Sequence, residues 1–481
     1  MKIAFAIFAL LGGFATAGEL PELLRTVAGD PVTTVQQWEA VRRPELLQTF
    51  TTNVFGVRSV ERPASLTFEQ AGTNRVMVEG RAIRKLIDIR YSGPGGNGCI
   101  RVHAFIPIRS TPAPGFLLIC NRDPEANIDP ERIQKSPFWP VEEVVARGYA
   151  ALAFYNGDVC PDRSTGFTVG VHAIFEPDPS VRTEESWATI SAWAWGASRV
   201  MDWIETEPLL DAAHIAVIGH SRGGKTALWT GATDPRFAFV ISNDSGCTGA
   251  KLNHMDLPSS ESIASITRSF PHWFCTRYNS FAGQEFEMPF DQHELLALVA
   301  PRLLAVGSAS QDNWAGQRGE LASAVFASPA WELYGKRGIV GTNFPPAELP
   351  MQEGNISYHL RSGGHNLVLY DWNRYMDFVD RHGWCFTPVV DHALSFDTTS
   401  GDQHHATNLV SAGGLLKFGS NTLTLDGTNL LGGDTLVCGG TLCADWGAGL
   451  DSNHAVRLRG GCLSSPSGEI AGRLGTGAGE V

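Results

Sequence analysis

The sequence predicts a mostly parallel β-sheet covered by helices, followed by a small C-terminal repeat of short strands. Strand-like and helix-like segments alternate from about residue 20 to 390, a pattern typical of α/β folds. From about residue 395 charged residues become rare, and apolar residues alternate with Gly, Thr, Asn and Ser. A chain of 481 residues is long enough for one large α/β domain with an appendage.

The N-terminal 17 residues have the composition of a secretory signal peptide. Lys2 supplies a positive charge, the stretch Ile3–Phe14 is almost wholly apolar, and Ala15-Thr16-Ala17 offers small residues for cleavage before Gly18. The apolar run is too short to span a bilayer, and the alternative is a buried N-terminal helix. We therefore expect a secreted protein that is extracellular or periplasmic, or attached to the cell surface, with no membrane-spanning segment.

Composition excludes some partners. The formal net charge of −13 argues against a nucleic-acid-binding protein, which needs a basic face. Nine cysteines are consistent with export, but Cys438 and Cys443 lack the further ligands that a zinc site requires. We expect a monomer that needs no metal and no cofactor.

The α/β region is expected over residues 18–390. A helix-like segment with Trp187, Ile190, Ala194 and Met201 at helical spacing leads to the strand before the stretch at residue 217. The segments predicted as strands are Arg101–Ile108, Gly115–Cys120, Tyr149–Tyr155, His214–Gly219, Phe237–Ser242 and Arg302–Gly307.

The stretch "VIGHSRGGKTALW" contains the pattern G-x-S-x-G between a buried strand and a helix. The sharp turn needs small residues two before and two after the serine, here Gly219 and Gly223. It lifts the Ser221 hydroxyl above the carboxyl edge of the sheet and directs backbone N–H groups at a developing oxyanion. The pattern predicts Ser221 as a nucleophile; the alternative is a Gly-rich turn before a helix.

A serine nucleophile needs a base, and the base needs an orienting acid. His365 follows a late strand and a glycine pair, whereas His359 falls inside that strand. Two acids follow strands, Asp244 in "SNDSG" and Asp312 in "SASQDNW". Both stand where open α/β sheets place their sites, so the residues alone leave the choice of acid open.

Two cations flank the nucleophile. Arg222 follows it directly, so its backbone N–H and its guanidinium are both candidates to stabilise an oxyanion. Lys225 lies one helical turn after Ser221 on the same face, where it suits a polyhydroxylated or acid-derived acyl group. A fatty-ester site would favour apolar residues here. The alternative for each cation is a solvated side chain.

Several segments together resemble the bacterial glucuronoyl esterases of carbohydrate esterase family 15. These are "VQQWEAVRRPELLQTF", "GHSRGGKTALW", "SNDSGCTGAKL", "SFPHWFCTRYNSF", "PFDQHELLALVAPRLLAV", "DNWAGQRGE" and "HLRSGGHNLVLYDWNRYMDF", in the order of the family, over roughly residues 30–388. The resemblance implies an α/β-hydrolase fold without a metal. It implies hydrolysis of esters between 4-O-methyl-glucuronic acid on glucuronoxylan and lignin alcohols.

The same resemblance implies roles for single residues. Ser221 matches the nucleophile, His365 the base and Arg222 the oxyanion-stabilising arginine. Sugar-contacting positions match Lys225, Glu261 and Trp314, although the glycine that usually precedes the glutamate is absent. The family places its acid at one of two positions, and this chain has both, Asp244 and Asp312; the shorter aspartate at the first position favours Asp312. Cysteines that fungal members carry beside the nucleophile and the base are replaced by His220 and Asn366.

The C-terminal stretch Gly413–Gly447 alternates apolar and small polar residues between glycines, which predicts short strands of a β-solenoid. It resembles autotransporter-associated β-strand repeats over about one and a half repeats. The alternative is a disordered Gly-rich tail. We expect a linker over residues 391–410 and the repeat over residues 411–481.

Two other functions compete with glucuronoyl ester hydrolysis. One is an acetyl- or feruloyl-type polysaccharide esterase, which Lys225 disfavours because acetate offers it nothing to bind. The other is a catalytically inactive carbohydrate-binding or adhesion module with the repeat as its anchor. The presence of the serine, the histidine and both acids argues against that second alternative.

Overall fold

The computed structural model describes residues 19–109, 111–255 and 257–384, and parts of 394–464. Within this last range the gaps are 407–408, 412–413, 427–428, 432–433, 445–455 and 459–460. The expected signal peptide over residues 1–17 lies outside the described residues. Among the described helices, none combines the length and apolar content that crossing a bilayer requires. Seven cysteines of the described residues are free thiols: Cys99, Cys120, Cys160, Cys247, Cys275, Cys443 and Cys462.

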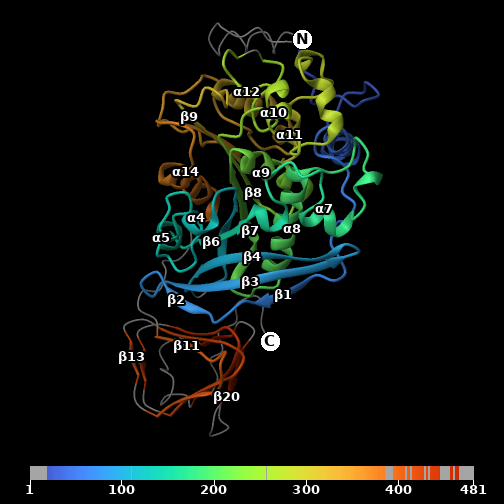
Figure 1. Cartoon of the computed structure of the whole chain (residues 1–481). Coiled ribbons are helices and arrows are strands. Elements are labelled where there is room, and N and C mark those ends of the chain that lie inside the picture. The colour runs from blue at the N-terminus through green and yellow to red at the C-terminus, as the bar shows by residue number, and fades with distance from the viewer. Residues whose placement is uncertain are drawn as a thin grey trace.

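Ten strands of the described residues form one sheet in the order β1-β3-β4-β6-β5-β7-β8-β9-β10, with β2 paired to β3 (Figure 1). The strands β5 to β10 run parallel to one another, and β1 to β4 form an antiparallel edge of the sheet. This architecture confirms the predicted α/β-hydrolase class. The strands are β1 (Thr67–Gln70), β2 (Arg75–Met77), β3 (Ala82–Gly93), β4 (Gly96–Pro107), β5 (Ala113–Cys120), β6 (Ala150–Tyr155), β7 (Leu210–His220), β8 (Phe239–Asn243), β9 (Leu303–Ala309) and β10 (Ile356–Arg361).

Helices cover both faces of the sheet because its central strands are apolar on both sides. In β7, Val217 joins the apolar cluster of one face and Ile218 the cluster of the other. The first cluster contains side chains of α8 (Thr189–Ile204), α9 (Arg222–Thr233), α11 (Gln292–Ala297) and α12 (Gln317–Ala327). The second contains side chains of α5 (Val141–Ala146) and α14 (Leu369–Val379). Near-continuous apolar runs are what parallel strands buried on both faces require.

The remaining helices are short. They are α2 (Val35–Gln37), η1 (Trp38–Arg42), α3 (Arg43–Phe50), η2 (Thr51–Phe55), α4 (Pro124–Asn127), α6 (Asn156–Val159), α7 (Gly170–Phe175), η3 (Pro179–Val181), α10 (Ile263–Ser269), η4 (Thr276–Phe281), η5 (Glu285–Glu287), α13 (Pro329–Glu332) and η6 (Asp380–Trp384).

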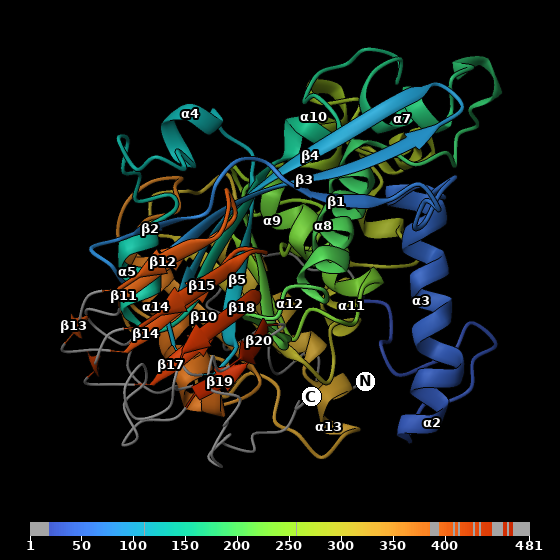
Figure 2. The same ribbon diagram turned by 90° about the horizontal axis from the view of Figure 1, so that it is seen from below.

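The C-terminal segment forms a coil of short parallel strands. Three sheets stack along it, β11-β14-β17-β19, β12-β15-β18-β20 and β13-β16, and Figure 2 shows β12, β15, β18 and β20 in this order. Leu394 pairs with Leu415, Leu415 with Thr435 and Leu423 with Leu442, so one turn of the coil takes 19 to 21 residues. The strands are β11 (Leu394–Asp397), β12 (Gln403–His405), β13 (Val410–Ser411), β14 (Leu415–Phe418), β15 (Thr422–Leu425), β16 (Leu430–Leu431), β17 (Thr435–Val437), β18 (Gly440–Ala444), β19 (Val456–Leu458) and β20 (Gly461–Ser464).

The coil begins earlier than the sequence pattern indicates. Its first strand starts at Leu394, inside the segment 391–410 that we expected to be a linker. Leu394, Phe396 and Leu409 pack against the apolar interior of the coil, but they are too sparse to produce a recognisable strand pattern. Leu416 and Phe418 belong to the same cluster of buried apolar side chains as the α/β domain, so the coil packs on that domain.

The register of the central strands brings four loops to one edge of the sheet. Gly219 of β7 lies beside Ser242 of β8, and Asn243 lies beside Gly307 of β9. The carboxyl ends of β7, β8, β9 and β10 therefore meet, and this is the edge where open α/β sheets place their sites.

Candidate active site

The turn between β7 and α9 has the geometry that the sequence predicts. Ser221 adopts φ 58° and ψ −124° directly before the first residue of α9. A Cβ atom on Gly219 would lie 1.9 Å from the carbonyl oxygen of Gly223, a contact that no side chain tolerates. Glycine is therefore required there so that the turn can close, and the turn holds the serine in a sparsely populated conformation of the kind found at functional sites.

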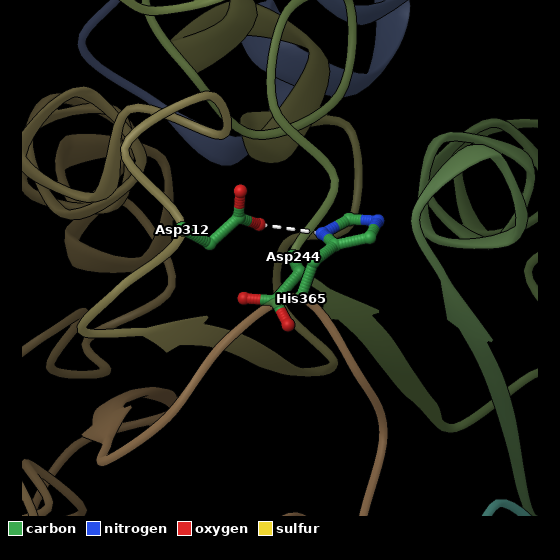
Figure 3. Close-up of side chains that lie close together, drawn as sticks. All are labelled: Asp244, Asp312 and His365. Carbon is green, nitrogen blue, oxygen red and sulfur yellow. Dashed lines mark hydrogen bonds and ion pairs between the residues drawn. The ribbon is translucent and has the colours of Figure 1, made fainter.

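The imidazole of His365 lies beside this turn. It follows β10, its ring centroid is 4.4 Å from that of His220, and its side chain is 43% exposed. Nδ1 of His365 is 2.5 Å from Oδ2 of Asp312, in the loop after β9 (Figure 3). This bond fixes the ring and leaves Nε2 as the nitrogen that is available for proton transfer.

The second candidate acid, Asp244, has different surroundings. It follows β8, is 1% exposed and has a positive φ of 45°. Its Oδ2 is 3.3 Å from Nη2 of Arg361, and its Oδ1 has no hydrogen-bond partner. Burial raises the pKa of Asp244 well above 3.8, and the charges of Glu320 and Asp371 add to the rise. The structure thus brings both acids near His365 but hydrogen-bonds only Asp312 to it.

These three residues are the one group within the described ranges whose candidate metal-ligand atoms all lie within 4.8 Å of one another. Two of these ligand atoms already have protein partners. Nδ1 of His365 is hydrogen-bonded to Asp312, and the carboxylate of Asp244 forms an ion pair with the guanidinium of Arg361. A serine, a histidine and an acid at one sheet edge form the arrangement of acyl-transfer enzymes.

His359 is not available as a base. It is 1% exposed inside β10, and its Nε2 is 2.9 Å from Oδ1 of Asp371. The same carboxylate accepts a hydrogen bond from Nε of Arg361. His359 therefore belongs to a buried polar network beneath the site, as its place inside the strand predicted.

Arg222 is held by groups from three other segments. Its Nε is 2.6 Å from Oδ2 of Asp162, its Nη2 donates to the backbone carbonyl of Asn121 over 3.2 Å, and its guanidinium lies 5.8 Å from the ring centroid of Trp273. The same Asp162 carboxylate is 2.9 Å from Nε2 of His272 and accepts from Nε1 of Trp273 at 2.7 Å. These contacts fix the position of a cation beside the nucleophile.

Lys225, Glu261 and Trp314 form a connected group. Lys225 is 3% exposed, and its ammonium donates to the carbonyls of Ser245 and Cys247 at 2.5 and 2.6 Å and to Oε2 of Glu261 at 3.1 Å. Trp314 donates from Nε1 to Oε1 of Glu261 over 3.2 Å, and it is 53% exposed. Lys225 is therefore buried, which contradicts the alternative that its side chain is solvated.

Sequence reasoning missed several residues that support the site. Asp162 and His272 come from loops far from the elbow in the chain, and no local pattern marks them. Glu320 is fully buried in α12, and its Oε1 accepts from the backbone N–H groups of Ser245 and Gly246. It thereby fixes the loop whose carbonyls bind Lys225. The segments "SFPHWFCTRYNSF" and "DNWAGQRGE", which resemble the family, contain His272 and Glu320, whereas no signal in the sequence pointed to Asp162.

Comparison with known proteins agrees with this site. The family described as "Glucuronyl esterase, fungi" matches residues 144–335. A 4-O-methyl-glucuronoyl methylesterase 1 from Wolfiporia cocos is 32% identical over 177 residues, which cover 35% of this chain and 42% of that protein.

Two longer matches cover about three quarters of the chain. Carbohydrate esterase MZ0003, from an unknown prokaryotic organism, is 33% identical over 391 residues, which cover 76% of this chain and 89% of that protein. The solved structure of a glucuronoyl esterase from Solibacter usitatus is 34% identical, with a TM-score of 0.71, and the match covers 77% of this chain and 99% of that chain. At this identity and coverage, the chain belongs to the glucuronoyl esterases of carbohydrate esterase family 15, which are carboxylic ester hydrolases.

Proposed function

We propose that this chain hydrolyses 4-O-methyl-D-glucuronoyl esters that link glucuronoxylan to lignin alcohols, through an acyl-enzyme on Ser221. The observation that carries the proposal is one constellation at one sheet edge. A strained serine turn, a histidine hydrogen-bonded to Asp312 and an anchored arginine next to the serine meet there in a chain of this family. The name of the Wolfiporia cocos relative supports the acyl group.

The proposed mechanism uses only side chains and backbone groups of the chain. His365 takes the proton of Ser221 while the serine oxygen attacks the uronoyl carbonyl carbon, and Asp312 stabilises the imidazolium that forms. Arg222 and backbone N–H groups hold the oxyanion. His365 then gives the proton to the departing alcohol oxygen. A water molecule then gives a proton to His365 while its oxygen attacks the acyl carbon. His365 returns this proton to the Ser221 oxygen as the ester bond breaks, and the uronic acid that is released ionises to the uronate.

The group of Lys225, Glu261 and Trp314 suits the sugar ring in this proposal. An exposed indole offers an apolar face, and the Glu261 carboxylate accepts hydrogen bonds from hydroxyls. Because the three donors of Lys225 already bind protein acceptors, we infer that this residue either orients Glu261 or exchanges one acceptor for a sugar hydroxyl.

A comparison of two substrates tests the proposal. We expect kcat/KM for benzyl D-glucuronate to exceed that for 4-nitrophenyl acetate by at least about tenfold, since the acetyl group offers nothing to the sugar-binding groups. Release of benzyl alcohol and of 4-nitrophenol measures the two rates. A preference for the acetyl ester would contradict the glucuronoyl assignment and favour a general polysaccharide esterase.

Asp162 is expected to act as a positioning residue for Arg222. Asp162→Asn removes the charge that anchors the guanidinium, so we expect kcat/KM for the glucuronate ester to fall about tenfold. In an Arg222→Gln background the same change is expected to cost less than about twofold, because no guanidinium remains to be positioned. Equal losses in both backgrounds would show that Asp162 acts on folding alone.

The organisation of the chain is also a proposal. We infer that residues 1–17 direct export, that residues 18–390 form the catalytic domain and that the enzyme acts as a monomer. The C-terminal coil has the solenoid form typical of a repeat. Its resemblance to autotransporter-associated repeats suggests attachment to a surface.

A further inference from the structure

Arg122 is a cation beside the nucleophile to which the mechanism above assigns no role. It follows β5, which pairs in parallel with β7, the strand that carries Ser221 at its end. The carbonyl of the preceding residue, Asn121, accepts a hydrogen bond from Arg222 over 3.2 Å. The loop after β5 therefore lies directly against the turn of Ser221.

A chain of ring contacts places the guanidinium of Arg122 on the base side of this turn as well. It lies 4.2 Å from the ring centroid of Phe138. The Phe138 ring contacts the His220 ring edge to face at 5.9 Å, and His220 is 4.4 Å from His365. Arg122 is thus close to both neighbours of the nucleophile in the chain, His220 and Arg222.

Among the residues that the structure describes, no carboxylate forms an ion pair with Arg122. Its side chain makes no hydrogen bond and no ion pair with any of the residues that the structure describes. Two acids of the neighbouring loops are engaged elsewhere: Asp123, the next residue in the chain, caps α4, and Asp162 binds Arg222, His272 and Trp273. Stacking on Phe138 occupies one face of the guanidinium and leaves its N–H donors at the rim available.

This arrangement is electrostatically unfavourable without a ligand. Arg122 is half-buried, and burial is the main cause that lowers its pKa, with the charge of Arg222 acting in the same direction. The two guanidinium groups lie close enough to repel each other, and an anion bound by both would turn this repulsion into attraction. The lack of a protein anion is notable in a chain with a net charge of −13.

We propose that Arg122 is a second catalytic arginine, which acts with Arg222 on the negative oxygen that forms on the acyl carbon of the substrate. This inference rests on the proposed function. The order of the strands supports it, because Arg122 follows β5 on one side of β7, whereas Glu261 and Trp314 follow β8 and β9 on the other. In α/β-hydrolases, the loop after the strand that corresponds to β5 supplies a backbone N–H group to the oxyanion hole.

The proposal extends to the product. When the acyl-enzyme is hydrolysed, the acyl carbon becomes the carboxylate of the uronate, so the same two arginines face a full negative charge. Arg122 therefore strengthens the binding of free glucuronate as well as the binding of the transition state. A neutral alcohol product receives no such contribution. This difference separates the role of Arg122 from general effects on the cleft.

The experiment compares Arg122→Gln and Arg122→Lys with wild type, and uses Lys336→Gln as the matched control for loss of one positive charge. Lys336 is exposed and lies next to α13, whose Trp331 binds the carbonyl before β9, at the opposite edge of the sheet. We expect Arg122→Gln to lower kcat for benzyl glucuronate by about ten- to a hundredfold and to raise the inhibition constant of glucuronate about tenfold. Arg122→Lys is expected to recover part of the wild-type kcat and part of the glucuronate affinity. Lys336→Gln is expected to change neither kcat nor the inhibition constant.

The outcomes distinguish this inference from the proposed function. Wild-type protein that does not hydrolyse benzyl glucuronate contradicts the proposed function, and calorimetric binding of glucuronate to wild type and Arg122→Gln then tests Arg122 by itself. An Arg122→Gln protein with wild-type kcat and wild-type glucuronate affinity overturns the inference. A lower unfolding temperature with unchanged glucuronate affinity also overturns it, because that result assigns Arg122 to packing on Phe138.

Discussion

Replacing Ser221 with alanine is expected to lower kcat for benzyl glucuronate by about four orders of magnitude or more, because the acyl-enzyme can no longer form. The residual rate reflects the oxyanion-binding groups, which remain in place. The turn depends on Gly219 and not on the hydroxyl, so we expect the unfolding temperature to stay within about 2 °C of wild type. Quenched-time-point assays of benzyl alcohol release measure the effect.

An exposed serine outside the site supplies the matched control. Ser280 lies in η4, and its hydroxyl donates to the backbone carbonyl of Arg277. Ser280→Ala is expected to keep kcat within about twofold of wild type. A Ser221→Ala protein that retains most of the wild-type rate would favour a different nucleophile, and a wild-type protein without any turnover would favour the adhesion-module alternative.

Asp312→Asn is expected to lower kcat by about three to four orders of magnitude, whereas Asp244→Asn is expected to lower it less than about tenfold. Only Asp312 accepts a hydrogen bond from His365, and an amide in its place selects the wrong imidazole tautomer and does not stabilise the imidazolium. Asp244 contacts Arg361, and its raised pKa reduces its negative charge. The two isosteric variants control for each other; the reverse order of effects would assign Asp244 as the orienting acid.

The pH dependence of stability separates these aspartates further. Because the folded protein holds the proton of Asp244 more tightly than the unfolded chain, wild type loses stability from this group as the pH rises above 3.8. Asp244→Asn removes that loss. The unfolding temperature of this variant relative to wild type is therefore expected to rise from pH 4 to pH 7, as thermal unfolding followed by circular dichroism can measure.

The catalytic residues that could be identified from local sequence patterns are those whose positions are fixed by the backbone around them. The pair Gly219 and Gly223 flanks a serine between a buried strand and a helix, and few backbone paths satisfy that pattern. His365 follows a strand and two glycines, so its loop could be placed at the sheet edge. The fold itself follows from the alternation of apolar segments, which needs no knowledge of distant contacts.

What the sequence did not predict depends on contacts between distant segments. The residues alone left the choice between Asp244 and Asp312 open, and only the family resemblance favoured Asp312. In the structure Arg361 engages Asp244, and His365 is hydrogen-bonded to Asp312. The burial of Lys225 depends on carbonyls of the 245–247 loop, and the anchoring of Arg222 depends on Asp162. The early start of the coil at Leu394 depends on packing that three scattered apolar residues do not reveal.

The most direct test of the account is the detection of the acyl-enzyme. Wild-type protein mixed with excess benzyl glucuronate and quenched in acid within milliseconds should show, in peptide mass spectrometry, a glucuronoyl group on the peptide that carries Ser221. The adduct should be absent in Ser221→Ala. An adduct on another residue, or rapid turnover without any adduct in a quench series fast enough to resolve a single turnover, would contradict the central claim.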